Sequence, residues 1–148
     1  MKREIPMVSL KYKRPKSKEP IYIREPEKPY ELLRDNWSDT LDHVESMYLL
    51  LLSKSNEVLG VILHSTGGTS STVVDNKTIL QAVILSNASA VIMAHNHPSG
   101  TLEISGSDIT VTRRLSQALN LFNITILDHL ILTSDSYTSF VEQGISLS

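Results

Sequence analysis

The sequence contains no cysteine. A disulfide framework, a thiolate zinc site and a thiol nucleophile are therefore excluded, and a metal ion would have to be held by histidine, aspartate or glutamate. The sequence also has no apolar run near the roughly 18 residues that span a membrane, and its N-terminus lacks the apolar core of a signal peptide. These absences lead us to expect a cytoplasmic protein.

The length and composition predict one globular domain. The 148 residues are 41% hydrophobic and 20% charged, which is ordinary for a folded domain. A chain of this length buries about 70% of the surface that its unfolded form exposes, so it needs no cross-links to form a core.

Positive charge is concentrated near the N-terminus. Residues 1–28 hold nine lysines and arginines and four glutamates, a net charge of +5, whereas residues 29–148 hold five lysines and arginines and twelve acidic residues, a net charge of −7. We therefore divide the chain into a basic, proline-rich arm (1–28), with a short strand near Met7–Tyr12, and a domain (29–148). The arm is either a solvated tail, which is the commoner case, or a contact for nucleic acid.

Hydrophobic patterns and turn signals predict alternating strands and helices after the arm. This order indicates an α/β fold in which helices flank a mixed β-sheet within a single domain. The expected elements are a short helix from Pro29, a hairpin of strands at 46–52 and 58–63, a β-branched stretch at 71–74, a helix at 76–87 with Asp75 as N-cap, a strand at 89–94, a helix at 106–121, and strands at 124–132 and 136–140.

The residues most suited to chemistry lie at 94–108, in the sequence AHNHPSGTLEISGSD. His95 and His97 follow an apolar strand, and residues i and i+2 of an extended backbone point to the same side, so the two rings can converge. Asp108 follows His97 by eleven residues. Two imidazoles and a carboxylate suit zinc, and three protein ligands leave a fourth position for water, which is typical of a catalytic zinc site.

Each part of this stretch also has a simpler interpretation. A His-x-His pair alone is weak evidence for a metal, and Pro-Ser-Gly is a turn. Ser105 and Asp108 fit a capping box at the start of a helix. The capping and metal roles are compatible, because a helix that begins directly after the histidine-bearing loop would hold Asp108 near the two imidazoles.

A hydrolytic zinc site also needs a general base. The sequence has no HExxH motif, so the base would have to come from another part of the chain. Glu45 is the best candidate, because it precedes the most hydrophobic strand, where an unpaired carboxylate is costly. The alternative is that Glu45 merely ends the polar loop before that strand.

The spacing of these residues resembles the JAMM motif of the JAB/MPN metalloprotease superfamily, in the order Glu45, His95-Asn96-His97-Pro98, Ser105-Gly106-Ser107-Asp108. More narrowly, HNHPSG, SxxDxxxTRRL (105–115) and LDHLIL (127–132) are similar to the bacterial RadC family. The resemblance covers roughly residues 29–148. It implies an MPN (JAB)-type α/β fold with a zinc ion bound by His95, His97 and Asp108 and with water at the fourth position.

The same resemblance implies that Glu45 is the general base and that Ser105 helps to stabilise the oxyanion of a tetrahedral intermediate. The expected function is that of a zinc-dependent hydrolase, similar to a metallopeptidase or isopeptidase. In such a mechanism zinc lowers the pKa of its bound water, Glu45 accepts the proton, the hydroxide attacks an amide carbonyl, and protonated Glu45 serves the leaving amine.

The sequence departs from the superfamily pattern in two ways. Asn96 stands where peptidase members usually have serine or threonine, which favours the RadC-like branch. RadC proteins also typically carry a helix-hairpin-helix region before the JAB domain, whereas this chain has only the basic arm. A DNA-binding role of that region therefore cannot be carried over to this chain. The alternative function is a nucleic-acid-binding module associated with DNA repair, with the basic arm as its contact and without hydrolytic activity. The sequence specifies neither the substrate nor the oligomeric state.

The remaining histidines and two arginines have ordinary interpretations. His129 belongs to an Asp-His pair in a predicted strand and is expected to have a hydrogen-bonded structural role. His64 and His43 are expected on the surface, and Arg113 and Arg114 on the solvated face of a helix.

Overall fold

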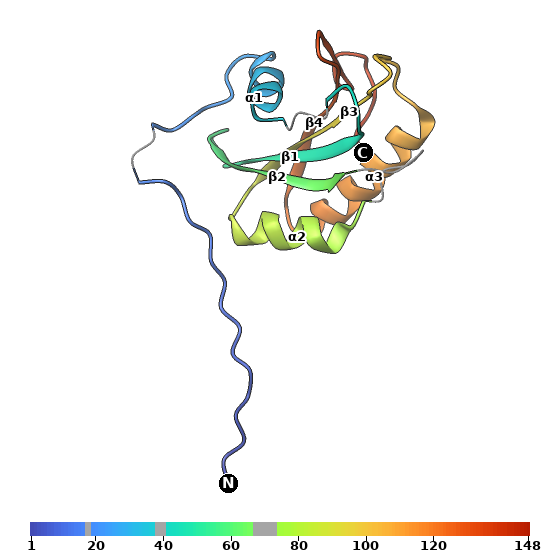
Figure 1. Ribbon diagram of the computed structural model, residues 1–148. Coiled ribbons are helices and arrows are strands. Elements are labelled where there is room, and N and C mark those ends of the chain that lie inside the picture. Colours follow the sequence, from blue (N-terminus) through green and yellow to red (C-terminus); the bar gives the residue numbers. More distant parts are fainter. Residues whose placement is uncertain (17–18, 38–40, 67–73) are drawn as a thin grey trace.

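A five-stranded β-sheet with helices on both faces forms the body of the protein (Figure 1). The computed structural model describes residues 1–16, 19–37, 41–66 and 74–148. Its elements are α1 (Lys28–Asn36), β1 (Ser46–Leu52), β2 (Val58–Thr66), α2 (Asn76–Leu85), β3 (Ala90–Asn96), α3 (Gly106–Asn120), β4 (Thr125–Leu132) and β5 (Tyr137–Ser139).

The sheet is mixed, as the order of elements predicts. Its strands lie in the order β2-β1-β3-β4-β5. The strand β1 is antiparallel to both β2 and β3, β3 is parallel to β4, and β5 returns antiparallel to β4. The parallel pair is connected through α3, because parallel neighbours require a crossover and cannot be joined by a tight turn.

The central strand β1 explains why helices cover both faces of the sheet. All seven of its residues are buried. Successive side chains of a strand point to opposite faces. Every second residue from Met47 therefore joins the core under α2 and α3, and the residues from Tyr48 join the core under α1. A strand buried on both faces reads as a continuous apolar run, which is the pattern of MYLLLL.

The helix α1 is fixed to its face of the sheet by large side chains. Leu33 is almost fully buried. Trp37 lies against Tyr48 with ring centroids 4.3 Å apart, and Tyr30 stacks on Tyr137 with centroids 4.7 Å apart. The predicted proline at the first turn of this helix is present.

The predictions of the five strands in the sheet are confirmed, with shifts at some ends. The bounds of β1 agree at both ends with the predicted 46–52, and β2 continues beyond residue 63 to Thr66. The strand β3 continues beyond the predicted residue 94 to Asn96, because its pairing with β4 extends that far, so His95 lies within the strand. The predicted stretch at 71–74 lies largely outside the described residues.

The helices α2 and α3 end slightly earlier than the sequence pattern predicts. Asp75 caps α2 as predicted, with its carboxylate accepting hydrogen bonds from the N–H groups of Lys77 and Thr78. Each helix is followed by an asparagine in the left-handed conformation, Asn87 after α2 (φ 56°) and Asn123 after α3 (φ 57°). Asparagine tolerates this conformation and commonly ends a helix there.

The arm contains no strand near Met7–Tyr12, and that prediction is wrong. Residues 1–15 have no regular structure, and the start of the arm extends away from the domain (Figure 1). A strand needs a hydrogen-bonded neighbour, and the hydrogen bonds of the arm to the body begin at Tyr12, whose hydroxyl donates to the carbonyl of Leu59. Tyr22 then forms an isolated bridge with Glu57. No helix of the described residues is long and apolar enough to cross a membrane.

Candidate metal centre

Three segments meet at the C-terminal end of β3. His95 pairs with Ile131 of β4, next to the last pair of the two strands. The N–H of His97 continues the pairing by donating to the carbonyl of Leu132. The first turn of α3, which carries Asp108, follows the loop after His97. Because β1 is antiparallel to β3 and pairs Met47 with His95, the start of β1 lies at the same edge. The fold therefore gathers residues from β1, β3 and α3.

The predicted ligands His95, His97 and Asp108 lie within contact distance of one another. The two Nε2 atoms are 3.0 Å apart. Oδ1 of Asp108 is 3.4 Å from Nε2 of His95, and Oδ2 is 3.9 Å from Nε2 of His97. Two ligands of a tetrahedral zinc ion, each 2.0–2.1 Å from the metal, lie about 3.3 Å apart. The spacing of these three side chains therefore fits a metal ion between them.

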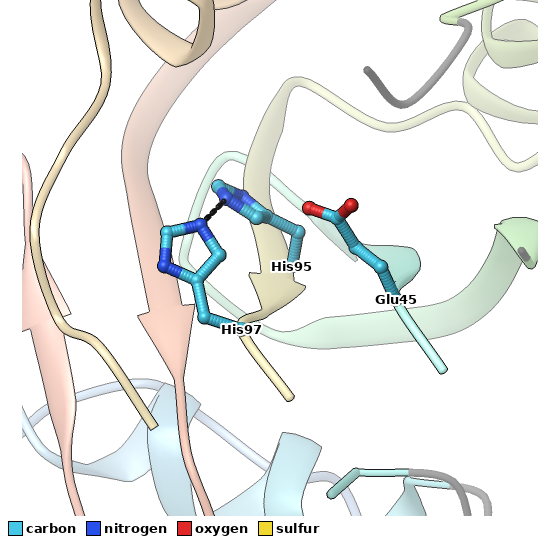
Figure 2. A group of neighbouring side chains, drawn as sticks. All are labelled: Glu45, His95 and His97. Carbon is cyan, nitrogen blue, oxygen red and sulfur yellow. Dashed lines mark hydrogen bonds between the residues drawn. The ribbon is translucent and has the colours of Figure 1, made fainter. Parts of the chain in front are cut away.

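Glu45 also faces this point. It directly precedes β1, is partly buried, and its carboxylate points toward the two histidine rings (Figure 2). One ligand atom from each of Glu45, His95 and His97 lies within 4.8 Å of the others, so these three residues could also hold a metal ion. The sequence interpretation gave Glu45 the role of a base, and the structure brings it close enough to be a ligand as well.

The capping box predicted for α3 is present alongside this geometry. The hydroxyl of Ser105 accepts a hydrogen bond from the N–H of Asp108, and the Asp108 carboxylate accepts one from the N–H of Ser105, both at 3.0 Å. An accepting hydroxyl keeps its own proton to donate to another group. Ser105 is exposed next to the cluster, so that proton is accessible to a bound molecule.

Asp108 carries a negative charge at neutral pH. Its partial burial alone would raise the pKa of this carboxyl group, but the hydrogen bond and charge of His95 and the hydrogen bonds from Ser105 outweigh burial and lower the pKa well below its ordinary value. An ionised carboxylate is the form that binds a metal.

The chemistry of the donor set fits zinc. Nδ1 of His97 lies 2.9 Å from the carbonyl oxygen of Thr101, which can only accept, so this nitrogen carries the proton and Nε2 offers a lone pair. No lysine or arginine of the described residues forms an ion pair with Glu45 or Asp108. Imidazole nitrogen and carboxylate oxygen are common zinc ligands, and a divalent cation would neutralise the two carboxylates.

Asn96, between the two histidines, has a contact set that sequence reasoning missed. Its side chain is fully buried. Oδ1 accepts from the N–H of Ser46 at 2.7 Å, and Nδ2 donates to the carbonyls of Leu41 at 2.7 Å and Val44 at 2.9 Å. One amide therefore ties the segment around Glu45 to the end of β3. The only sequence signal was the position of Asn96 itself, because its partners are 50 or more residues away.

His129 lies directly behind His95 and is buried. Its Nε2 is 2.7 Å from Nδ1 of His95, and its Nδ1 is 2.6 Å from the hydroxyl oxygen of Thr112, so the predicted hydrogen-bonded position is confirmed. Burial lowers the pKa of His129 well below its ordinary value and keeps the ring neutral. Its neighbour Asp128 is half-buried and accepts from the hydroxyl of Ser139, and burial raises the pKa of that carboxyl group.

The other histidines and the two arginines were all expected on the surface. His43 is exposed, as predicted. His64 was expected on the surface but is half-buried, and its Nε2 accepts from the N–H of Asp75 at 3.0 Å. The side chains on α3, Arg113 and Arg114, are exposed, as predicted.

The mixed β-sheet flanked by helices, with two histidines at the end of β3 and an acidic residue at the start of α3, is consistent with a JAB/MPN-type fold. The family model described as the RadC-like JAB domain matches residues 23–145, so the chain belongs to the RadC-like JAB domain family. The match begins within the segment assigned to the arm, and the boundary at residue 28 stays a prediction.

Relatives of the chain are bacterial proteins that carry the name UPF0758. One from Flavobacterium johnsoniae is 38% identical over 101 residues, which are 68% of this chain and 44% of that protein. One from Porphyromonas gingivalis is 40% identical over 102 residues, 68% of this chain and 45% of that protein. One from Aquifex aeolicus is 35% identical over 138 residues, 93% of this chain and 58% of that protein. The chain therefore spans about half the length of these relatives.

Proposed function

We propose that this protein is a zinc-dependent hydrolase of amide bonds, similar to a metallopeptidase or isopeptidase. The observation that carries the proposal is the convergence of two histidines and two carboxylates on one point, with Nε2 of His95 lying 3.0 Å from Nε2 of His97 and 3.4 Å from Oδ1 of Asp108. Structural zinc sites use four protein ligands, whereas three ligands and a separate carboxylate suit catalysis. In this assignment His95, His97 and Asp108 hold the ion, and Glu45 remains available for proton transfer.

The chain's own residues would divide the work of hydrolysis. A bound zinc ion supplies a Lewis acid, which polarises a carbonyl and acidifies water. The Glu45 carboxylate would accept the proton of the attacking water and return it to the leaving amine. The Ser105 hydroxyl, whose oxygen accepts from the N–H of Asp108, would donate a hydrogen bond to the oxyanion of the intermediate.

The alternative function, a nucleic-acid-binding module without hydrolysis, is supported by a different observation. Residues 1–15 have no regular structure, the start of the arm extends away from the domain, and the arm carries a net charge of +5. An exposed basic segment binds phosphate backbones with an affinity that falls as the salt concentration rises. Such a module would lose its affinity when the arm is removed and would keep it when the histidines are replaced.

Elemental analysis of the tag-free protein tests the metal centre. We expect about one zinc ion per chain in the wild type and almost none in His97→Ala, because two ligands hold zinc too weakly to survive purification. The matched control is His43→Ala, which removes an exposed histidine two residues from Glu45 and should keep the ion. Equal zinc contents in the wild type and His97→Ala, even after zinc is added back, would contradict the proposal.

The variant Glu45→Gln tests whether Glu45 is a general base or a metal ligand. We expect this variant to keep its zinc and to lose at least about a hundredfold in the rate of hydrolysis of a peptide or isopeptide panel, which is the usual contribution of a general base. Loss of zinc from Glu45→Gln would make Glu45 a ligand and would refute its assignment as the base. Absence of hydrolysis by zinc-loaded wild type, together with binding of DNA that depends on the arm (residues 1–28), would support the alternative function.

A further inference from the structure

A chain of three hydrogen bonds runs behind His95 and returns to Asp108. It passes from Nδ1 of His95 to His129 (2.7 Å), from His129 to the Thr112 hydroxyl (2.6 Å), and from that hydroxyl to the backbone carbonyl of Asp108 (2.7 Å). All three side chains in it are at most 1% exposed. The chain therefore links two predicted metal ligands through two residues, His129 and Thr112, that do not face the metal position.

The donor and the acceptor of each hydrogen bond follow in turn from the backbone carbonyl of Asp108. A backbone carbonyl can only accept, so the Thr112 hydroxyl must donate to the carbonyl of Asp108. A hydroxyl has one proton. Since that proton is used, the oxygen of Thr112 can only accept from Nδ1 of His129, which therefore carries an N–H.

The same reasoning continues through His129. The ring is buried and stacks on Phe140 with centroids 4.4 Å apart, and the neighbouring carboxylate of Asp128 binds the hydroxyl of Ser139. A ring in this apolar position is neutral and has a single N–H. With the proton on Nδ1, the Nε2 atom of His129 is an acceptor, so Nδ1 of His95 must donate to it.

We propose that Thr112 and His129 are positioning residues that hold the proton of His95 on Nδ1 and thereby present its Nε2 lone pair to a divalent metal ion. Which nitrogen of a histidine is metallated is set by the hydrogen bond of the other nitrogen. The opposite tautomer would place an N–H on Nε2 of His95, where it could donate to Nε2 of His97 at 3.0 Å, but His95 could then not be a metal ligand. The Thr112 hydroxyl, in the second turn of α3, therefore determines which ring nitrogen of His95 carries the proton.

This inference rests on the proposed metal centre, and Thr112 offers a series that tests it. Thr112→Val keeps the shape of the side chain and removes the hydroxyl, whereas Thr112→Ser keeps the hydroxyl. We expect the zinc dissociation constant of the full chain, measured by competition with a chelator, to rise about 10- to 100-fold in Thr112→Val and to return to within a few-fold of wild type in Thr112→Ser. Ser116→Ala, which removes another buried hydroxyl of α3, should leave the affinity unchanged.

The tautomer itself can be observed without metal. Long-range proton–nitrogen correlation spectra of ¹⁵N-labelled, zinc-free protein should show the proton of His95 on Nδ1 in the wild type and in Thr112→Ser, and a mixture of tautomers in Thr112→Val. Wild-type zinc affinity in a folded Thr112→Val would overturn the inference. If that variant does not fold, a wild-type spectrum with the proton of His95 on Nε2 would overturn it.

These readouts distinguish the inference from the proposed function. If the wild type binds no zinc, the proposed function fails, while the spectrum of the zinc-free wild type still tests the chain of hydrogen bonds behind His95. If the wild type binds zinc and Thr112→Val binds it equally well, the metal centre is supported and the positioning role of Thr112 and His129 is refuted.

Discussion

Asn96 shows how one side chain can use its full hydrogen-bonding capacity to shape a site without facing it. Its oxygen accepts from Ser46, and both of its N–H donors are used, by Leu41 and Val44. Serine or threonine at this position has one donor and could not satisfy both carbonyls at once. The amide therefore holds the peptide segment around Glu45 in a way that a hydroxyl would not.

We predict that Asn96→Ala lowers the free energy of unfolding by about 2–4 kcal/mol, because it removes three hydrogen bonds of one buried side chain at once. Urea denaturation measures this loss. The control is Asn36→Ala, since Asn36 is exposed and its side chain, among the residues that the structure describes, donates to the carbonyl of Leu32 alone. Its effect should stay within about 0.5 kcal/mol. Equal stability of the two variants would show that the segment around Glu45 is held by other contacts.

At the scale of the element, the N-cap of α2 makes the stability of the fold depend on pH. The side-chain hydrogen bond from Thr78 is the main cause that lowers the pKa of Asp75, and the backbone N–H groups of Thr78 and Lys77 act in the same direction. A carboxyl group whose pKa is lower in the folded state stabilises the fold above its unfolded pKa of about 3.9 and loses this contribution as the pH falls through its folded pKa.

We therefore predict that Asp75→Asn is less stable than the wild type at neutral pH and that the difference shrinks below about pH 4. Melting temperatures of both proteins between pH 7 and pH 3 test this. Thr78→Val removes the hydroxyl that lowers the pKa, so in that background the difference should shrink at a higher pH. A difference between the wild type and Asp75→Asn that does not change with pH would contradict the assignment.

The elements that could be predicted from the sequence are those whose signals are local. The run MYLLLL predicts β1, and Asp75 and Ser105 predict the starts of α2 and α3, because an N-cap is made by residues within one turn. The prediction of a strand near Met7 was wrong, because a short stretch of sequence does not show whether a neighbouring strand is there to pair with it.

In the candidate site, too, only the residues with a local sequence signal could be predicted. His95, His97 and Asp108 are suggested by their spacing along one stretch, since a strand end and a helix start are joined by a short loop. The contacts of His129 with His95 and Thr112 span 34 and 17 residues, and they depend on how β3, β4 and α3 pack. No spacing rule in the sequence expresses that packing, so the residues behind the ligands could be seen only in the fold.

At the scale of the whole molecule, the proposed metal would couple binding to stability. A ligand that binds only the folded state stabilises it by an amount that grows with its free concentration, about 2.7 kcal/mol at one hundred times its dissociation constant. We predict that a chelator lowers the melting temperature of the wild type and that added zinc restores it. His97→Ala should melt at one temperature in both conditions, and an equal response of the two proteins would contradict metal binding at this site.

The meeting of β3 and α3 at this corner has a further consequence for a chain without cysteine. His95 and His97 lie at the end of β3 and Asp108 in the first turn of α3, so an ion held among them would cross-link these two elements. A disulfide would also restrict the unfolded chain. A metal bridge is lost on unfolding, so the denatured protein would keep its full conformational freedom, and the cross-link would re-form only after both elements have found their places.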